Sequence, residues 1–139
     1  MDRGDISMKK LPDTEYEVMK AVWDNTPPVT TTMIMEQIGN EHGWPVPALI
    51  TMLTRLNEKG FLYSEKKGKM RYYYPLIKKA DYIEFATRDF MQKYHNDSFT
   101  SFYSTYYDVR MISDEALDKF VAWVKNRRGE FRRYHSDNQ

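Results

Sequence analysis

Positive charge is concentrated in one short stretch of the chain. Residues 44–75 carry six Lys and Arg against two acidic residues, a net charge of about +4, whereas residues 1–43 carry four against eight. Four of the basic residues lie within six positions: Lys66, Lys67, Lys69 and Arg71. Because all 139 residues together have a net charge of only +1, this stretch predicts a local contact with nucleic-acid phosphates. The alternative is a solvated surface that keeps the protein soluble.

A second candidate surface lies in the first half of this stretch, on the side of a predicted helix that its apolar residues leave exposed. Its candidate residues are Pro47, Ala48, Ile50, Thr51, Thr54 and Arg55. Thr51 can hydrogen bond to a base edge or a phosphate, and Arg55 can reach a phosphate or a guanine. Pro45, Pro47 and Ala48 offer only apolar contacts, for instance to thymine methyl groups. Either threonine is equally well interpreted as an ordinary solvated residue.

Apolar residues at helical spacing predict the elements that hold these side chains in place. The first is a helix over about 14–24, which the Pro27-Pro28 pair ends because proline cannot continue the hydrogen-bond ladder. Thr14 and Glu17 match a capping box, in which the Thr14 hydroxyl accepts a hydrogen bond from the backbone N–H of Glu17. The pattern therefore predicts that this helix is capped by its own side chains.

Two more helices are expected at short intervals. Thr30 is predicted to cap the second helix, which ends near Gly39. The third helix begins near Pro45, since proline suits a first helical turn, and it ends at Gly60. This third helix carries the second candidate surface on its exposed side.

A β-hairpin is predicted directly after the third helix. Residues 61–65 and 70–74 are β-prone, and the basic residues 66–69 separate them as a turn. Three helices followed by a basic-tipped hairpin form a winged helix-turn-helix, in which one helix fits the major groove and the hairpin lies along phosphates. Thr30 and Thr31, at the start of the second helix, complete the candidate DNA contacts.

The character of the chain changes after Leu76. Helices are predicted over about 78–94, from Ser98 to about 107, and from Ser113 onward. The predicted fold class is mainly α with a small β-hairpin wing, a winged helix-turn-helix followed by a helical dimerisation region. Its expected parts are a flexible N-terminus (1–10), a DNA-binding domain (11–76), the dimerisation region (77–126) and a polar tail (127–139).

Several classes of function are excluded by what the sequence lacks. There is no Cys, which removes disulfides, thiolate nucleophiles and Cys zinc sites. The three histidines do not have the spacing of metal ligands: His42, His95 and His135. The sequence also contains no glycine-rich phosphate loop. We therefore expect neither an enzyme nor a bound metal or cofactor. With no apolar run of roughly 18 residues and no signal peptide, we expect a cytoplasmic protein without membrane insertion.

Three stretches together resemble the penicillinase-repressor family (BlaI/MecI/CopY). Residues 11–23, ending in Trp23, are similar to its opening helix. Residues 43–60 are similar to its recognition helix and the residues that end that helix. Residues 68–75 are similar to its wing. The resemblance departs at Pro47-Ala48, where many members have polar residues and a Thr, and at Ile50, where a Lys or Arg is common.

This resemblance implies a homodimeric winged-helix transcriptional repressor of a palindromic operator, whose C-terminal helices interlock. The residues that would supply the dimer interface here are Phe90, Phe99, Phe102, Tyr103, Tyr106, Leu117, Phe120 and Trp123. The alternative is that these residues fill a monomeric core. Three short helices carry more aromatic surface than one molecule is expected to hide, which favours the dimer.

The resemblance also bears on how repression would be relieved. Copper-responsive members use C-terminal Cys pairs, which this chain lacks. Beta-lactam-responsive members are cut at an Asn-Phe bond in a BlaR/MecR-type membrane sensor protease pathway, and the matching place here is Thr105-Tyr106. Two other functions stay open. One is a regulator with a small-molecule pocket among the C-terminal tyrosines, and the other is a winged-helix protein-interaction module.

Overall fold

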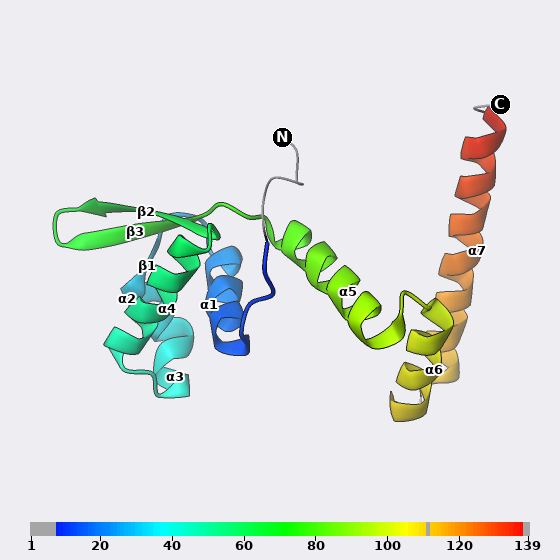
Figure 1. The fold of residues 1–139 in the computed structure, drawn as a ribbon, viewed down its shortest axis with the longest axis horizontal. Coiled ribbons are helices and arrows are strands. Elements are labelled where there is room, and N and C mark those ends of the chain that lie inside the picture. Colours follow the sequence, from blue (N-terminus) through cyan, green and yellow to red (C-terminus); the bar gives the residue numbers. More distant parts are fainter. Residues whose placement is uncertain (1–7, 111, 138–139) are drawn as a thin grey trace. The chain divides into compact units, whose positions relative to one another are not determined.

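The structure is a computed structural model that describes residues 8–110 and 112–137 (Figure 1). Most of the predicted flexible segment, 1–10, therefore lies outside the described residues. The chain divides into an N-terminal unit that ends at Phe90 and a C-terminal unit that begins at Met91. The predicted division at residue 76 stays a prediction.

The N-terminal unit holds three helical segments and one small sheet, and the long helix α5 begins in it. Its elements are α1 (Asp13–Asp24), β1 (Val29–Thr30), α2 (Thr31–Ile34), the π-helical turn η2 (Met35–Gly39), α3 (Asn40–His42), α4 (Val46–Glu58), β2 (Leu62–Lys67), β3 (Met70–Pro75) and α5 (Lys79–His95). The helix-turn-helix is the run α2–η2–α3 followed by α4. The predicted fold class, mainly α with a hairpin wing, is confirmed.

The sheet is three-stranded and antiparallel, in the order β1-β3-β2. The hairpin places Lys66 opposite Arg71 and Ser64 opposite Tyr73. The two-residue strand β1, which the sequence analysis did not predict, pairs Val29 with Tyr73 on the other edge of β3. Figure 1 shows the hairpin extending well past the helices, so its far end is free to reach a ligand.

A single apolar core fixes α4 against the rest of this unit. Leu49, Leu53 and Leu56, on one side of α4, are completely buried, and so is Phe61 at the start of the hairpin. Tyr82 of α5 is also buried, and its hydroxyl accepts a hydrogen bond of 2.8 Å from the backbone N–H of Leu11. The first turn of α5 is thus part of the packing that positions α4.

The capping box predicted for the first helix is wrong. The helix α1 starts at Asp13, and the carbonyl of its N-cap residue, Pro12, accepts the N–H of Tyr16 at 2.9 Å. No side chain caps this end. The reason is that Leu11 is buried and leads the chain into the helix one residue early, which places Thr14 inside the first turn.

The second helix begins as predicted but ends later. Thr30 is its N-cap, and its hydroxyl accepts the N–H of Met33 at 3.2 Å. Gly39 does not end it, because Gly39 has helical backbone angles and is buried close to Met35. The left-handed residue that stops the helix is Gly43, with φ of +71°. The predicted stop at Gly60, with φ of +81°, is confirmed.

The described part of the C-terminal unit consists of helices joined by short connections. It contains the end of α5, then α6 (Phe99–Arg110) and α7 (Asp114–Asp137), which continues through the segment predicted to be a polar tail. The predicted caps are present, since Ser98 accepts the N–H of Ser101 and Ser113 accepts the N–H of Ala116. Within the described ranges, no helix is long and apolar enough to cross a membrane.

Candidate nucleic-acid interface

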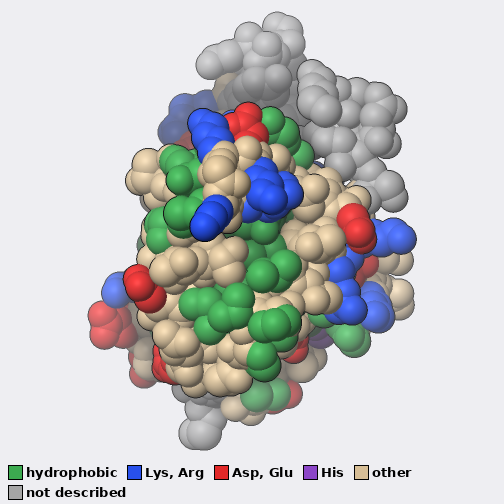
Figure 2. Space-filling model, turned by 90° about the vertical axis from the view of Figure 1, so that its left-hand side faces the viewer, with side chains coloured by type: hydrophobic (Ala, Val, Ile, Leu, Met, Phe, Trp, Pro, Cys, Tyr) green, Lys and Arg blue, Asp and Glu red, His purple; other side chains and the backbone are tan. Residues whose placement is uncertain are grey.

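The four cations of the wing lie at the free end of the hairpin. The strands pair as far as Lys67 and Met70, so the turn is only Gly68-Lys69 and not the four residues predicted. Gly68 has φ of +65°, which fits the first position of a type II′ turn. All four side chains are exposed. Figure 2 shows Lys and Arg side chains together in the upper part of the face toward which the hairpin points.

Short polar contacts along the strands organise this end of the hairpin. The guanidinium of Arg71 donates to the Ser64 hydroxyl at 3.0 Å, across the two strands. Glu65 accepts a hydrogen bond of 2.7 Å from the Tyr63 hydroxyl, which raises the pKa of Tyr63. The ammonium of Lys67 lies 3.9 Å from the Glu65 carboxylate in an exposed position, where such a pair is weak. The wing therefore presents mostly uncompensated positive charge.

The outward side of α4 carries the second candidate set. Ile50, Thr51, Thr54 and Arg55 are exposed there, and Ala48 is half-buried. The hydroxyls of Thr51 and Thr54 donate to the carbonyls four residues earlier, at 3.0 and 2.9 Å. They can still accept hydrogen bonds from a ligand, but their protons are used within the helix.

The two threonines at the start of α2 differ. Thr30 is 9% exposed, and its hydroxyl is engaged as the helix cap. Thr31 is half-buried, beside the start of the helix-turn-helix. Of the two threonines, only Thr31 is therefore a candidate for contact with a nucleic acid.

A partly buried ion pair ties the end of α4 to the start of α1. The Lys59 ammonium lies 2.5 Å from the Glu15 carboxylate, whose side chain is only 5% exposed. Sequence reasoning missed this pair, although the helical spacing of Glu15 with Val18 and Met19 places it on the buried side of α1. Of the six cations of residues 44–75, Lys59 is therefore paired with a carboxylate of the same chain.

Seven of the eight residues predicted for the dimer interface come together in the C-terminal unit. Phe99 and Tyr103 of α6 stack on Phe120 of α7, with ring centroids 5.9 and 5.6 Å apart. Trp123 also stacks on Phe120, with ring centroids 6.5 Å apart. The eighth residue, Phe90, belongs to the N-terminal unit.

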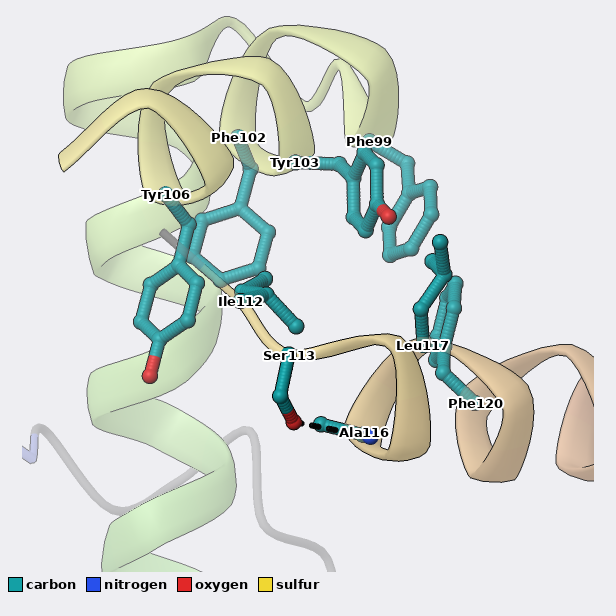
Figure 3. A pocket seen from close by; sticks show the side chains of 9 residues that line it. All are labelled: Phe99, Phe102, Tyr103, Tyr106, Ile112, Ser113, Ala116, Leu117 and Phe120. Carbon is teal, nitrogen blue, oxygen red and sulfur yellow. Dashed lines mark hydrogen bonds between the residues drawn. The ribbon is translucent and has the colours of Figure 1, made fainter. Parts of the chain in front are cut away.

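An apolar hollow of about 440 Å³ lies between α6 and α7. Figure 3 shows side chains from both helices pointing into it. Its lining residues are Phe99, Phe102, Tyr103, Tyr106, Ile112, Ser113, Ala116, Leu117 and Phe120. Despite this clustering, Phe99 and Trp123 are 56% and 55% exposed, so two helices alone leave much aromatic surface open.

The predicted cleavage region lies inside a helix. Thr105 and Tyr106 are both exposed residues of α6, and the Thr105 hydroxyl donates to the Ser101 carbonyl at 2.9 Å. Proteases bind substrates as extended segments, so cleavage at this bond would require α6 to open locally.

Comparison with known proteins decides the family. A family model described as "Penicillinase repressor" matches residues 11–126. The penicillinase repressor of Bacillus licheniformis is 30% identical over 129 residues, covering 88% of this chain and 100% of the relative. The chain belongs to the penicillinase repressor family. The family predicted from three motif stretches is thereby confirmed.

The chain is also similar to other repressors. The methicillin resistance regulatory protein MecI of Mammaliicoccus sciuri is 24% identical over 110 residues, or 79% of this chain and 89% of MecI. The DNA-binding domain of the repressor BlaI is 35% identical, with a TM-score of 0.47 over 54% of this chain and 94% of that one. The monomeric form of Bacillus licheniformis BlaI, in complex with the blaP half-operator, is 32% identical, with a TM-score of 0.46 over 53% and 89%.

Membership of the penicillinase repressor family also settles the class of function. Members are transcriptional repressors and not enzymes, as the sequence predicted. In the described part of the chain, no group of three acidic or histidine side chains is arranged to hold a metal ion.

One exposed residue on the candidate interface was missed by the sequence analysis. Val46, at the start of α4, is 46% exposed and lies one turn before Ile50. Its i, i+4 spacing with Ile50 was the available signal. The sequence analysis considered its neighbours Pro45, Pro47 and Ala48 as apolar contacts but did not include Val46.

Proposed function

We propose that the protein is a homodimeric repressor that binds a palindromic operator in duplex DNA in the cytoplasm. In each protomer α4 enters the major groove and the β2–β3 hairpin lies along the flanking phosphates. The observation that carries this proposal is one compact unit with an outward α4 surface and an exposed cationic hairpin end. The proposed DNA contacts are Thr31, Pro47, Ala48, Ile50, Thr51, Thr54, Arg55, Lys66, Lys67, Lys69 and Arg71.

Phosphate contacts and base contacts are assigned to different elements. The three wing lysines hold their ammonium groups on an exposed hairpin end, where they neutralise phosphates without reading sequence. On α4, Arg55 and Thr51 are proposed to discriminate between bases, at about 1–3 kcal/mol for a bidentate contact. Replacing Arg55 with Ala then lowers the preference for the operator. An equal loss on all sequences would make Arg55 a phosphate anchor instead.

The proposed dimer interface is the aromatic surface of the C-terminal unit. Phe99 and Trp123 expose more than half of their surface in a single chain, although aromatic residues of this size favour burial. A second copy related by two-fold symmetry covers the same residues on both subunits. It also joins two half-site readers, which raises operator affinity through effective concentration. Phe90 is retained in this proposal as a contributor from α5.

Relief of repression is proposed to occur by proteolysis near Thr105-Tyr106, in a pathway that begins at a membrane sensor protease. Opening α6 exposes the bond, and cutting it separates the helices that line the aromatic hollow. The product is a winged helix without its means of dimerisation. This product binds the operator weakly, so the promoter is released.

The test of the proposed function is DNA selection by the full chain. Duplexes are selected from a random 30-base-pair library, and their affinity is compared with that of unselected duplexes over a range of salt concentrations. A repressor of this kind enriches a palindrome and prefers it by 10³-fold or more. No enrichment, with affinity that ignores salt, would instead favour a protein-interaction module.

A second candidate is a repressor controlled by a small molecule, and the hollow between α6 and α7 favours it. Its volume of about 440 Å³ and its aromatic lining suit an apolar ligand. The two candidates differ in what releases DNA. Release by a small molecule with the chain intact supports the ligand, whereas release that needs a cut in α6 supports proteolysis.

A further inference from the structure

The first two turns of α4 present an apolar surface to solvent. Val46 and Ile50 are 46% and 45% exposed, and Pro47 between them is also exposed. We call these three residues the apolar patch. They are unusual because the buried side of the same helix already carries Leu49, Leu53 and Leu56, which are sufficient to hold it in the core.

Hydrogen-bond donors are scarce beside this patch. The hydroxyls of Thr51 and Thr54 donate to the carbonyls of Pro47 and Ile50, so they offer a ligand only lone pairs. The nearest strong donor on the outward side of α4 is Arg55. Arg55 lies five residues beyond Ile50 and nine beyond Val46, which is about 7.5 Å and about 13.5 Å along the helix axis.

These features match one chemical group in DNA. A recognition helix contacts base edges mainly with its N-terminal residues, and here those residues are apolar. The apolar group on the major-groove edge of a base pair is the 5-methyl group of thymine. We propose that the apolar patch determines operator specificity by covering thymine methyl groups, an inference that rests on the proposed function.

Charge on the same unit favours DNA over a protein as the occupant of the patch. The hairpin, which packs on α4, ends in four exposed cations. Figure 2 shows hydrophobic side chains on the same face as the basic ones. A DNA duplex can contact both kinds of side chain at once, because its phosphates lie beside a major groove that carries thymine methyl groups. An apolar protein surface would leave the cations unmatched.

Deoxyuridine scanning tests the proposal, since uracil differs from thymine only by the missing methyl group. In the duplex selected by the full chain, each thymine is replaced in turn by deoxyuridine and the affinity is measured. One or two positions in each half-site should lose about fourfold, the factor expected for one methyl group returned to water. Other positions, and random-sequence duplexes, should not change.

Two matched variants assign the effect to the patch. Ile50→Ala should lose the distinction between thymine and deoxyuridine at one position while it keeps the wing contacts. Ile83→Ala is the control, because Ile83 of α5 is also 45% exposed but lies outside the proposed interface. It should keep both the affinity and the distinction. Both positions are helical and exposed, so alanine is compatible with folding.

The outcomes separate this inference from the proposed function. Tight, selective binding that deoxyuridine does not weaken at any position would overturn the inference and leave the repressor intact. The same holds if Ile50→Ala weakens thymine and deoxyuridine duplexes equally, or if the selected half-site contains no thymine. Failure to select any sequence would instead remove the proposed function.

Discussion

The two units of this protein differ in how they hide apolar surface. Between Leu11 and Tyr82 lie sixteen buried apolar residues, a core that fixes every element of the winged helix. Beyond Tyr82, none of the side chains that the structure describes is buried. The C-terminal unit has large aromatic residues, but α6 and α7 are too few to enclose them.

This difference shows that aromatic content and self-sufficiency are separate properties. The N-terminal unit closes around α1, α4 and the sheet, so its stability does not need another chain. The C-terminal unit has stacked rings with more than half of Phe99 and Trp123 exposed, so its stability depends on what covers them. We therefore expect the N-terminal unit to be stable on its own, and the stability of the C-terminal unit to depend on association with another chain.

Removing the C-terminal unit gives the largest expected effect. A chain that ends at Phe90 keeps Tyr82 and the whole buried core, so it should fold as a monomer. Its operator affinity should fall by 10²-fold or more, because the two half-sites are no longer bound together. Sedimentation and DNA titration measure both properties. A full-length monomer with equal operator affinity would contradict the comparison.

Core truncations in the two units should differ in their dependence on concentration. Leu53→Ala should lower the free energy of unfolding by about 2–5 kcal/mol, because it leaves a cavity in a closed core. Phe120→Ala should lower the unfolding midpoint by an amount that changes with protein concentration, because it weakens association. Chemical denaturation at two concentrations distinguishes them. A concentration-independent Phe120→Ala effect would make the C-terminal unit self-sufficient.

Replacing Lys66, Lys67 and Lys69 with Ala should affect DNA binding and leave the fold unchanged. All three side chains are exposed, so the free energy of unfolding should change by no more than about 0.5 kcal/mol. Affinity for operator and for random DNA should fall together, and the slope of log K against log salt should flatten by up to about 0.9 per lost contact. An unchanged slope would remove the wing from the interface.

Tyr82→Phe should produce the smallest effect. It removes the hydroxyl that accepts the Leu11 N–H at 2.8 Å and leaves the ring contacts with Tyr16 and Phe61. The expected loss of stability is about 1–2 kcal/mol, which thermal unfolding of the chain ending at Phe90 resolves. Operator preference should be retained, since Tyr82 is remote from the proposed contacts in sequence and lies in the core. No loss of stability would show that the Tyr82–Leu11 hydrogen bond does not contribute to holding α5 on this unit.

Local signals account for the parts of the fold that were predicted. Thr30, Gly60 and Ser113 cap or end helices through contacts within a few residues, so their sequence neighbours are enough to assign them. The wing cations were predicted for the same reason, because they adjoin in sequence. The strand β2 runs two residues further toward the turn than predicted, because Gly68 allows a two-residue turn, whereas β3 begins at Met70 as predicted.

Distant contacts account for the parts that were not predicted. The strand β1 exists only because Val29 meets Tyr73, 44 residues later, and nothing in a two-residue segment indicates that pairing. Glu15 and Lys59 are equally far apart. On the candidate site, the exposure of Val46 depends on how α4 is rotated against the core, which periodicity gives only approximately at a helix end.

Gly39 has a consequence for how sequences of this family vary together. A Cβ atom built on Gly39 would lie 2.5 Å from the Met35 sulfur, whereas its helical backbone angles suit any residue. The restriction at position 39 is therefore imposed by the side chain at position 35, whose thioether is flexible. Alanine at 39 should be accommodated when the Met35 side chain changes rotamer or when residue 35 is small. Across homologues the two positions should covary, with a side chain at 39 occurring most often beside a small or flexible residue at 35.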